Sequence, residues 1–111
     1  MVIRGITFET ESADLSGASY AAVTNLGDLL NRYPALKVAV IGRTDNTGPF
    51  EFNIDRSERR AQAIAQALQT DFDVPTERLA AVGVGPLAPI DTNTTNYGRS
   101  QNRRVELVII G

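Results

Sequence analysis

The segment KVAVIGRTDNTGP at residues 37–49 decides the fold of this chain. Every position from Val38 to Ile41 is apolar, and such a run predicts a strand at residues 37–41 that is covered on both faces and lies centrally in a sheet. The glycines, Asn46 and proline that follow predict a loop over residues 42–49. Asp45 therefore lies just past the carboxyl end of the strand, where functional side chains of α/β proteins are often found.

The sequence on either side of this strand predicts a two-layer architecture. Apolar residues recur with helical spacing in residues 17–32 and again in residues 53–69. Strand-forming runs lie at residues 1–8, 79–84 and 104–110, and the polar residues 91–98 predict an exposed loop. The order β-α-β-α-β-β predicts an α/β (α+β) two-layer sandwich, in which two main helices cover one face of a mixed four-stranded sheet.

The composition excludes several classes of function. A chain of 111 residues is the size of one domain, and it contains no cysteine and no histidine. Thiol nucleophiles, Ser-His-Asp triads and zinc sites of the Cys/His type cannot be built from it, so we expect no cofactor and no metal. Eleven basic and thirteen acidic residues give a net charge of -2, which predicts no nucleic-acid partner.

Two explanations of the cellular location stay open from composition alone. No stretch approaches the roughly 20 consecutive apolar residues of a membrane span, and residues 1–10 lack the pattern of a signal peptide. The protein is then either cytoplasmic, or a single domain excised from a larger protein. In the second case we expect contact with a membrane only through segments outside this chain.

The loop after the central strand and the next helix bring candidate binding residues together. Asn53 and Arg60 are seven positions apart and share a helix face with Ser57, while Asp45 precedes that helix. An acid and a guanidinium framing one pocket suit an amino-acid zwitterion, with its ammonium on Asp45 and its carboxylate on Arg60. Two simpler interpretations stay open: Asp45 pairs directly with Arg60, or Asp45 accepts hydrogen bonds from its own turn.

The last strand carries a second cluster of charged residues. Arg104 and Glu106 are two positions apart and lie on one strand face, so we expect ion pairs across the sheet. Arg103 points to the other face. The run from Gly98 to Glu106 is expected to open this strand.

These motifs together resemble the OmpA-like C-terminal domain, the peptidoglycan-associating module also found in Pal lipoproteins and MotB stator proteins. The segment from Val38 to Asp45 resembles that family's apolar strand ending in Gly-His-Thr-Asp. A second family signature, Gly…Tyr-Asn-x-x-Leu-Ser-x-x-Arg-Ala, is matched by a set of spaced residues: Gly48, Phe52, Asn53, Ser57, Arg60 and Ala61. A third match is the run from Gly98 to Glu106, which includes Asn102, Arg103 and Arg104.

The resemblance implies a non-catalytic domain that holds the diaminopimelate of the peptidoglycan stem peptide. It implies a periplasmic location, in an outer-membrane or envelope protein that the domain anchors to the cell wall. It also implies the site: Asp45 for the ligand ammonium and Arg60 for its carboxylate, with further contacts from Asn53, Thr47, Arg103, Thr10 and Glu11. A homodimer is possible, since relatives can dimerise.

Two departures from the family pattern keep alternatives open. Arg43 stands where the family usually has His, and Arg56 stands where it usually has Leu. Arg56 must reach solvent or take an acidic partner, for which Glu51 and Asp55 are candidates. The alternatives to wall binding are a carboxylate-dependent cell-wall hydrolase and an interaction domain of the same fold that has lost the ligand.

Overall fold

The computed structural model describes residues 2–7 and 17–111, with side chains described from residue 20 onward. Four strands and three α-helices, with one short 3-10 helix, follow one another along the chain. Their bounds are β1 (Val2–Thr7), α1 (Gly17–Arg32), β2 (Val38–Arg43), α2 (Phe50–Phe72), η1 (Thr76–Arg78), β3 (Leu79–Gly85), α3 (Asn96–Asn102) and β4 (Arg104–Ile109).

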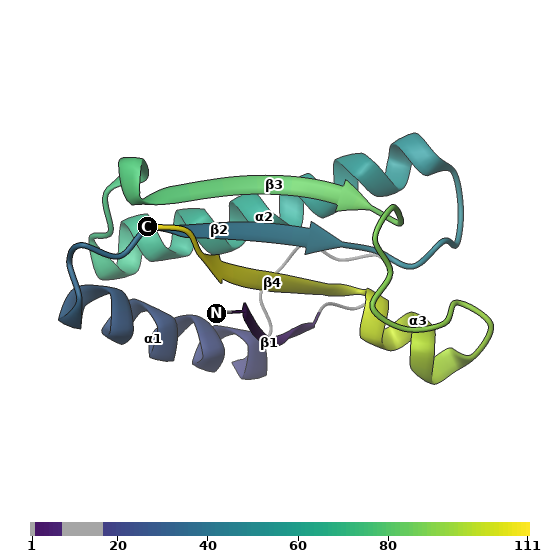
Figure 1. Cartoon of the computed structure of the whole chain (residues 1–111), viewed down its shortest axis with the longest axis horizontal. Helices are drawn as coiled ribbons and strands as arrows, with labels where there is room; N and C mark the ends of the chain where they lie inside the picture. Colours follow the sequence, from purple (N-terminus) through teal and green to yellow (C-terminus); the bar gives the residue numbers. More distant parts are fainter. Residues whose placement is uncertain (1, 8–16) are drawn as a thin grey trace.

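The strands form one mixed sheet in the order β1-β4-β2-β3 (Figure 1). β2 pairs in parallel with β3 and antiparallel with β4, and β1 pairs antiparallel with the far side of β4. The predicted fold class, the four-stranded mixed sheet and the central position of β2 are therefore confirmed. Because β2 and β3 run in parallel and β4 runs against them, the carboxyl ends of β2 and β3 meet the amino end of β4 at one end of the sheet.

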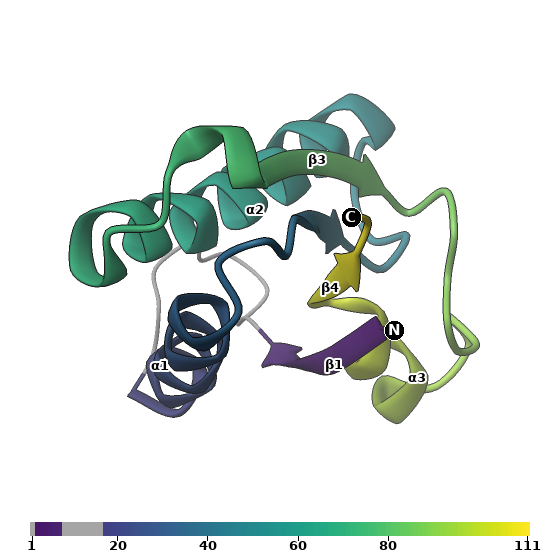
Figure 2. The ribbon, with the colours of Figure 1, turned by 60° about the vertical axis from the view of Figure 1, so that its left-hand side comes forward.

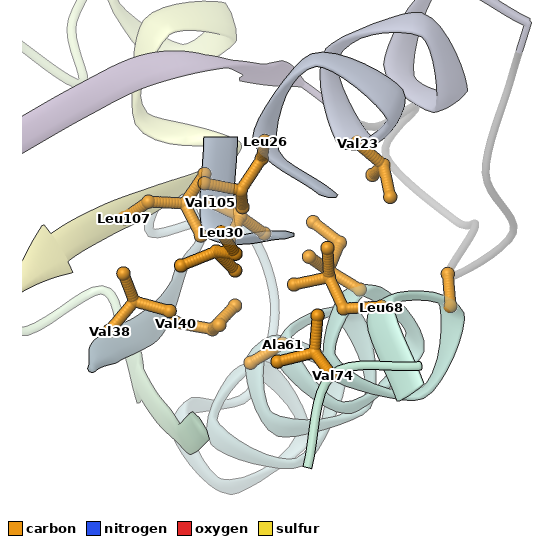
Figure 3. Close-up of a cluster of buried hydrophobic side chains, with 12 residues drawn as sticks. Val23, Leu26, Leu30, Val38, Val40, Ala61, Leu68, Val74, Val105 and Leu107 are labelled. Carbon is orange, nitrogen blue, oxygen red and sulfur yellow. The ribbon is translucent and has the colours of Figure 1, made fainter. Parts of the chain in front are cut away.

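Both long helices pack on one face of the sheet, as predicted (Figure 2). The core lies between them and the strands. Figure 3 shows the core side chains. Those that α1, α2, β2 and β4 contribute include Val23, Leu26, Leu30, Val38, Val40, Ala61, Leu68, Val105 and Leu107. Burying this apolar surface is the main stabilising contribution to the fold.

The prediction that β2 is covered on both faces is wrong. Val38 and Val40 are buried beneath the helices, whereas Ala39 and Ile41 on the other face are only half-buried. Neither long helix covers that second face. A continuous apolar run in a strand therefore does not require two covering layers here.

Glycines let α2 lie directly on the sheet. A Cβ atom added at Gly42 of β2 would come within 2.0 Å of the backbone oxygen of Ser57, and one added at Gly83 of β3 would come within 2.3 Å of the Glu58 nitrogen. The Ser57 hydroxyl also accepts a hydrogen bond of 2.9 Å from the backbone N–H of Gly85. These contacts fix the first half of α2 over the ends of β2 and β3.

Helix α2 is longer than predicted, since it extends beyond residues 53–69 at both ends. Its extra first turn contains Phe50 and Glu51. Of the helices in the described part of the chain, none combines the length and the apolar character needed to cross a membrane.

Helix α3 corrects the interpretation of residues 91–106. The predicted loop at residues 91–98 ends in the first turn of α3, and residues 98–102, which were expected to open the last strand, belong to this helix. The predicted start of the last strand at Arg104 is confirmed. Thr95 caps the helix, because its hydroxyl accepts a 2.9 Å hydrogen bond from the N–H of Gly98. Helical periodicity could not predict this seven-residue, largely polar helix, because it has no apolar stripe.

One buried side chain holds the segment before α3 in place. The Asn102 side chain accepts hydrogen bonds from the backbone N–H groups of Ile90 and Asp91, at 2.8 and 2.9 Å. Its amide group donates to the Asp91 carbonyl at 2.9 Å and to the Asn93 side chain at 2.8 Å. A single amide thus satisfies polar groups of three residues, Ile90, Asp91 and Asn93.

Candidate functional site

Three parts of the chain meet at the end of the sheet where β2 and β3 finish, on the right of Figure 1. The loop after β2 contributes Asp45 and Thr47. The first turn of α2 contributes Asn53, and Arg60 lies two turns further along the same buried face of the helix. The junction between α3 and β4 contributes Arg103, which is 58 positions from Asp45 in the sequence.

Asp45 is a buried acid with defined partners. The residue is 3% exposed. Its Oδ1 atom accepts a 2.9 Å hydrogen bond from the backbone N–H of Thr47, and its Oδ2 atom lies 2.7 Å from the Nη1 atom of Arg103. The interpretation in which Asp45 accepts a bond from its own turn is thus confirmed. Within the described residues, however, its ionic partner is Arg103 rather than Arg60.

These partners keep Asp45 ionised. Burial is the largest single effect on the pKa of Asp45 and raises it. The hydrogen bond from the Thr47 N–H and the hydrogen bond and positive charge of Arg103 together outweigh burial, so the net pKa of the carboxyl lies below its usual range. Asp45 is therefore a carboxylate at neutral pH and can accept an ammonium group.

Asn53 joins the Asp45 loop to α2. Its side-chain amide donates a 3.0 Å hydrogen bond to the Thr47 carbonyl, and its backbone N–H donates to Pro49 at 3.1 Å. Asn53 is buried, whereas Thr47 is exposed. The turn that carries Asp45 is therefore held to the helix from the Thr47 carbonyl, which leaves the Thr47 side chain toward solvent.

Arg60 lies on the buried face of α2 together with Asn53 and Ser57, as the seven-residue spacing predicted. Its relative exposure is 0%, and it is the largest fully buried side chain described. A charge in that position must be compensated by partners within the protein or by a ligand that enters the interior. Thr10 and Glu11, the other predicted site residues, lie outside the described residues.

Arg43, one departure from the family pattern, is paired within the fold. Its Nε atom forms an ion pair with the buried carboxylate of Glu106 on β4, and its Nη1 atom donates a 2.6 Å hydrogen bond to the Ala88 carbonyl. The expected ion pair across the sheet is thus confirmed for Glu106, while Arg104 bonds to the side chain of Gln101. Arg43 could not be predicted as the partner of Glu106, because the β2–β4 register brings the two residues together.

Arg56, the other departure from the family pattern, contacts an aromatic ring, which was not among its expected partners. Its guanidinium lies 4.5 Å from the centre of the Phe52 ring, one turn earlier on α2. Asp55, which was a candidate partner for Arg56, forms an ion pair of 2.5 Å with Arg59. The spacing of four residues between Phe52 and Arg56 was the available signal, since such residues are neighbours on a helix.

The arrangement is suited to binding a small charged group. It offers an ionised acid, a guanidinium and amide groups, all held by the strand ends and by α2. Among the residues that the structure describes, no group of three acidic side chains could hold a metal ion.

Comparison with known proteins shows which family the chain resembles. The OmpA family model matches residues 7–103. The probable lipoprotein YiaD of Escherichia coli K12 is 40% identical over 104 residues, which are 94% of this chain and 47% of that protein. The peptidoglycan-binding protein ArfA of Mycobacterium tuberculosis H37Rv is 38% identical over 104 residues, which are 94% of this chain and 32% of that protein.

The fold is also that of a solved structure. The crystal structure of the peptidoglycan-associated lipoprotein from Burkholderia pseudomallei superposes with a TM-score of 0.90 at 26% identity, over 97% of this chain and 91% of that chain. The chain spans less than half the length of the two curated relatives. Because the family model covers nearly all of its residues, and its strands and helices follow those of a solved member, the chain belongs to the OmpA family.

Proposed function

We propose that this chain binds peptidoglycan through the diaminopimelate of the stem peptide and anchors an envelope protein to the cell wall. The observation that carries the proposal is the buried, ionised Asp45 carboxylate beside a guanidinium at the end of the sheet. One relative is named as a peptidoglycan-binding protein and one structural neighbour as a peptidoglycan-associated lipoprotein. None of the relatives described above is named as an enzyme, and the chain is a non-catalytic domain.

The free end of diaminopimelate carries an ammonium and a carboxylate on one carbon atom. In our proposal Asp45 accepts the ammonium, while Arg60 and Arg103 contact the carboxylate. Asn53 and Thr47 add amide and hydroxyl contacts, and Thr10 and Glu11 complete the proposed set. Each shielded charge-assisted hydrogen bond contributes on the order of 1.5–3 kcal/mol, so two or three of them are enough for specific recognition.

The proposal places the domain in the periplasm, where peptidoglycan lies. We propose that residues 1–111 are a single domain of a larger envelope protein, attached to the outer membrane through another part of that protein. The relatives support this location, because they include a probable lipoprotein and an outer membrane porin.

Calorimetry with diaminopimelate and with a stem peptide tests the proposed site. Asp45→Asn keeps the size of the side chain and removes its charge, and we expect it to lose binding. Asp55→Asn is the matched control, because Asp55 is an exposed acid on α2. Arg60→Ala and Arg59→Ala form a second pair, since Arg59 is exposed one position from the buried Arg60.

Circular dichroism must show that the compared variants are folded. The proposal expects binding to be lost in Asp45→Asn and kept in both control variants. Unchanged affinity in folded Asp45→Asn and Arg60→Ala proteins would remove the proposed site.

Sedimentation with purified peptidoglycan tests the wider function. A binding module sediments with the polymer and releases no soluble fragments. Release of fragments would indicate a hydrolase, and failure to sediment would indicate an interaction domain that does not bind the wall.

A further inference from the structure

Arg103 is the more exposed member of its ion pair with Asp45. The Asp45 side chain is 5% exposed, whereas the Arg103 side chain bonded to it is 22% exposed. The other carboxylate oxygen is already bonded to the Thr47 N–H. Both carboxylate oxygens of Asp45 therefore already have a partner, and a ligand ammonium that binds Oδ2 must compete with the guanidinium of Arg103.

We propose that Arg103 is an internal counterion that the ligand must displace, so that ligand binding at this site is an exchange of cations. The ligand ammonium takes the place of the guanidinium on Asp45 Oδ2, and Arg103 turns to the ligand carboxylate. This inference rests on the proposed function, because it assumes that an amino-acid zwitterion binds at Asp45.

Electrostatics favour exchange over simple addition. Two cations on one buried carboxylate would lie within a few ångströms of each other, and their repulsion is poorly screened away from water. Glu106, the buried acid of β4, already forms an ion pair with Arg43. The displaced guanidinium could pair with Glu106 only if that ion pair were weakened. In our proposal the ligand carboxylate is the new partner of Arg103.

The position of Arg103 in the chain permits this movement. Its backbone is fixed at the end of α3, where its N–H donates a 3.1 Å hydrogen bond to the Arg99 carbonyl. The long side chain can change rotamer about this fixed backbone. The exchange therefore requires no movement of α3 or β4.

Exchange makes the site selective for zwitterions over simple amines. A zwitterion breaks the ion pair between Arg103 and Asp45, but its carboxylate forms a new ion pair with Arg103. A simple amine breaks the same ion pair and has no carboxylate to replace it. Arg103 would thus exclude polyamines and lysine side chains from the Asp45 carboxylate.

The test compares two probes that differ in their carboxylates. Diaminopimelate is the zwitterion, and 1,5-diaminopentane has the same carbon spacing between its ammonium groups and no carboxylate. Because the Thr47 N–H bonds to Asp45, its amide resonance in a two-dimensional NMR titration reports binding of either probe, even when binding is weak.

We expect Arg103→Gln to bind 1,5-diaminopentane about tenfold more tightly than the wild type, because the competing cation is gone. The same variant should bind diaminopimelate more weakly, because the contact with the ligand carboxylate is lost. Arg103→Lys retains a cation and should bind 1,5-diaminopentane as the wild type does. Arg59→Gln controls for the change in net charge, since its guanidinium is on the exposed face of α2.

The affinities of the wild type and of Arg103→Gln for 1,5-diaminopentane are sufficient to test whether ligand binding is an exchange of cations. No gain, or a loss, in folded Arg103→Gln would overturn it and make Arg103 a fixed part of the pocket. The affinity of the wild type for diaminopimelate decides the proposed function separately. A wild type that does not bind diaminopimelate would remove that function, whatever Arg103→Gln does with the diamine.

Discussion

Replacing Gly42 by alanine tests whether the close packing of α2 on the sheet holds the site together. The added Cβ would lie 2.0 Å from the Ser57 carbonyl oxygen, and ordinary contact begins near 3.4 Å, so the gap must open by the difference, 1.4 Å. The obstructing atom belongs to a helix backbone and cannot move by a rotamer change. The whole first half of α2 must therefore shift away from β2.

That shift should cost about 3 kcal/mol of unfolding free energy. Overpacking of a core usually costs about 1–3 kcal/mol, and contact with backbone puts this position at the upper end. Alanine recovers roughly 0.5–1 kcal/mol relative to glycine within a strand, which only partly offsets the cost. At about 4 °C per kcal/mol for a domain of this size, the melting temperature should fall by roughly 10 °C.

Urea unfolding followed by circular dichroism measures this change. Gly83→Ala should behave similarly, because its Cβ would lie 2.3 Å from the Glu58 nitrogen. Gly111→Ala is the control, since its Cβ would make only ordinary contact, at 3.4 Å, with the Lys37 side chain. If the unfolding free energy of Gly42→Ala lies within about 0.5 kcal/mol of the wild-type value, α2 does not pack tightly against the β2 backbone.

Three further predictions follow from polar groups in the same structure. Replacing Asn102 by Leu should cost about 2 kcal/mol in urea unfolding, because it removes the acceptor of two part-buried hydrogen bonds, those from the N–H groups of residues 90 and 91. Arg78→Lys should cost about 2 kcal/mol, because Arg78 donates to three carbonyls at the end of α1, those of Leu30, Tyr33 and Leu36, each at 2.9 Å. Asp45→Asn should be less stable than the wild type above about pH 4, the pKa of an unfolded Asp. Because the pKa of Asp45 is lowered in the folded protein, the difference in unfolding free energy should shrink as the pH falls through that pKa. Curves of unfolding free energy against pH that stay parallel down to about pH 2 would contradict this prediction.

The regular elements could be predicted because each shows a periodic pattern in the sequence. The apolar run from Val38 to Ile41 and the stripe through α2 each identify one element without reference to any other. The same spacing placed Asn53 and Arg60 together on one buried face. Helix α3 could not be predicted in this way, because it is held by a cap at Thr95 and by the hydrogen bonds of Asn102.

The pairing of charges within the site could not be predicted, because it depends on how distant strands align. Arg103 meets Asp45 only when β4 pairs antiparallel with β2 and α3 ends at Asn102. The same register brings Arg43 to Glu106. Local sequence predicted the position of Asp45 at the end of its strand. It could indicate only partners close to Asp45 in the chain, and the ionic partner that it indicated was therefore Arg60.

The antiparallel pairing of β1 with β4 determines how the domain would carry a mechanical load. Val2 lies opposite Val108, and Thr7 lies opposite Arg104, beside the end of the sheet that carries Asp45. A pull on Val2 against a ligand held at Asp45 would draw β1 lengthwise along β4. The hydrogen bonds of that ladder lie across the strands, so they would resist together in shear and would not unzip one after another.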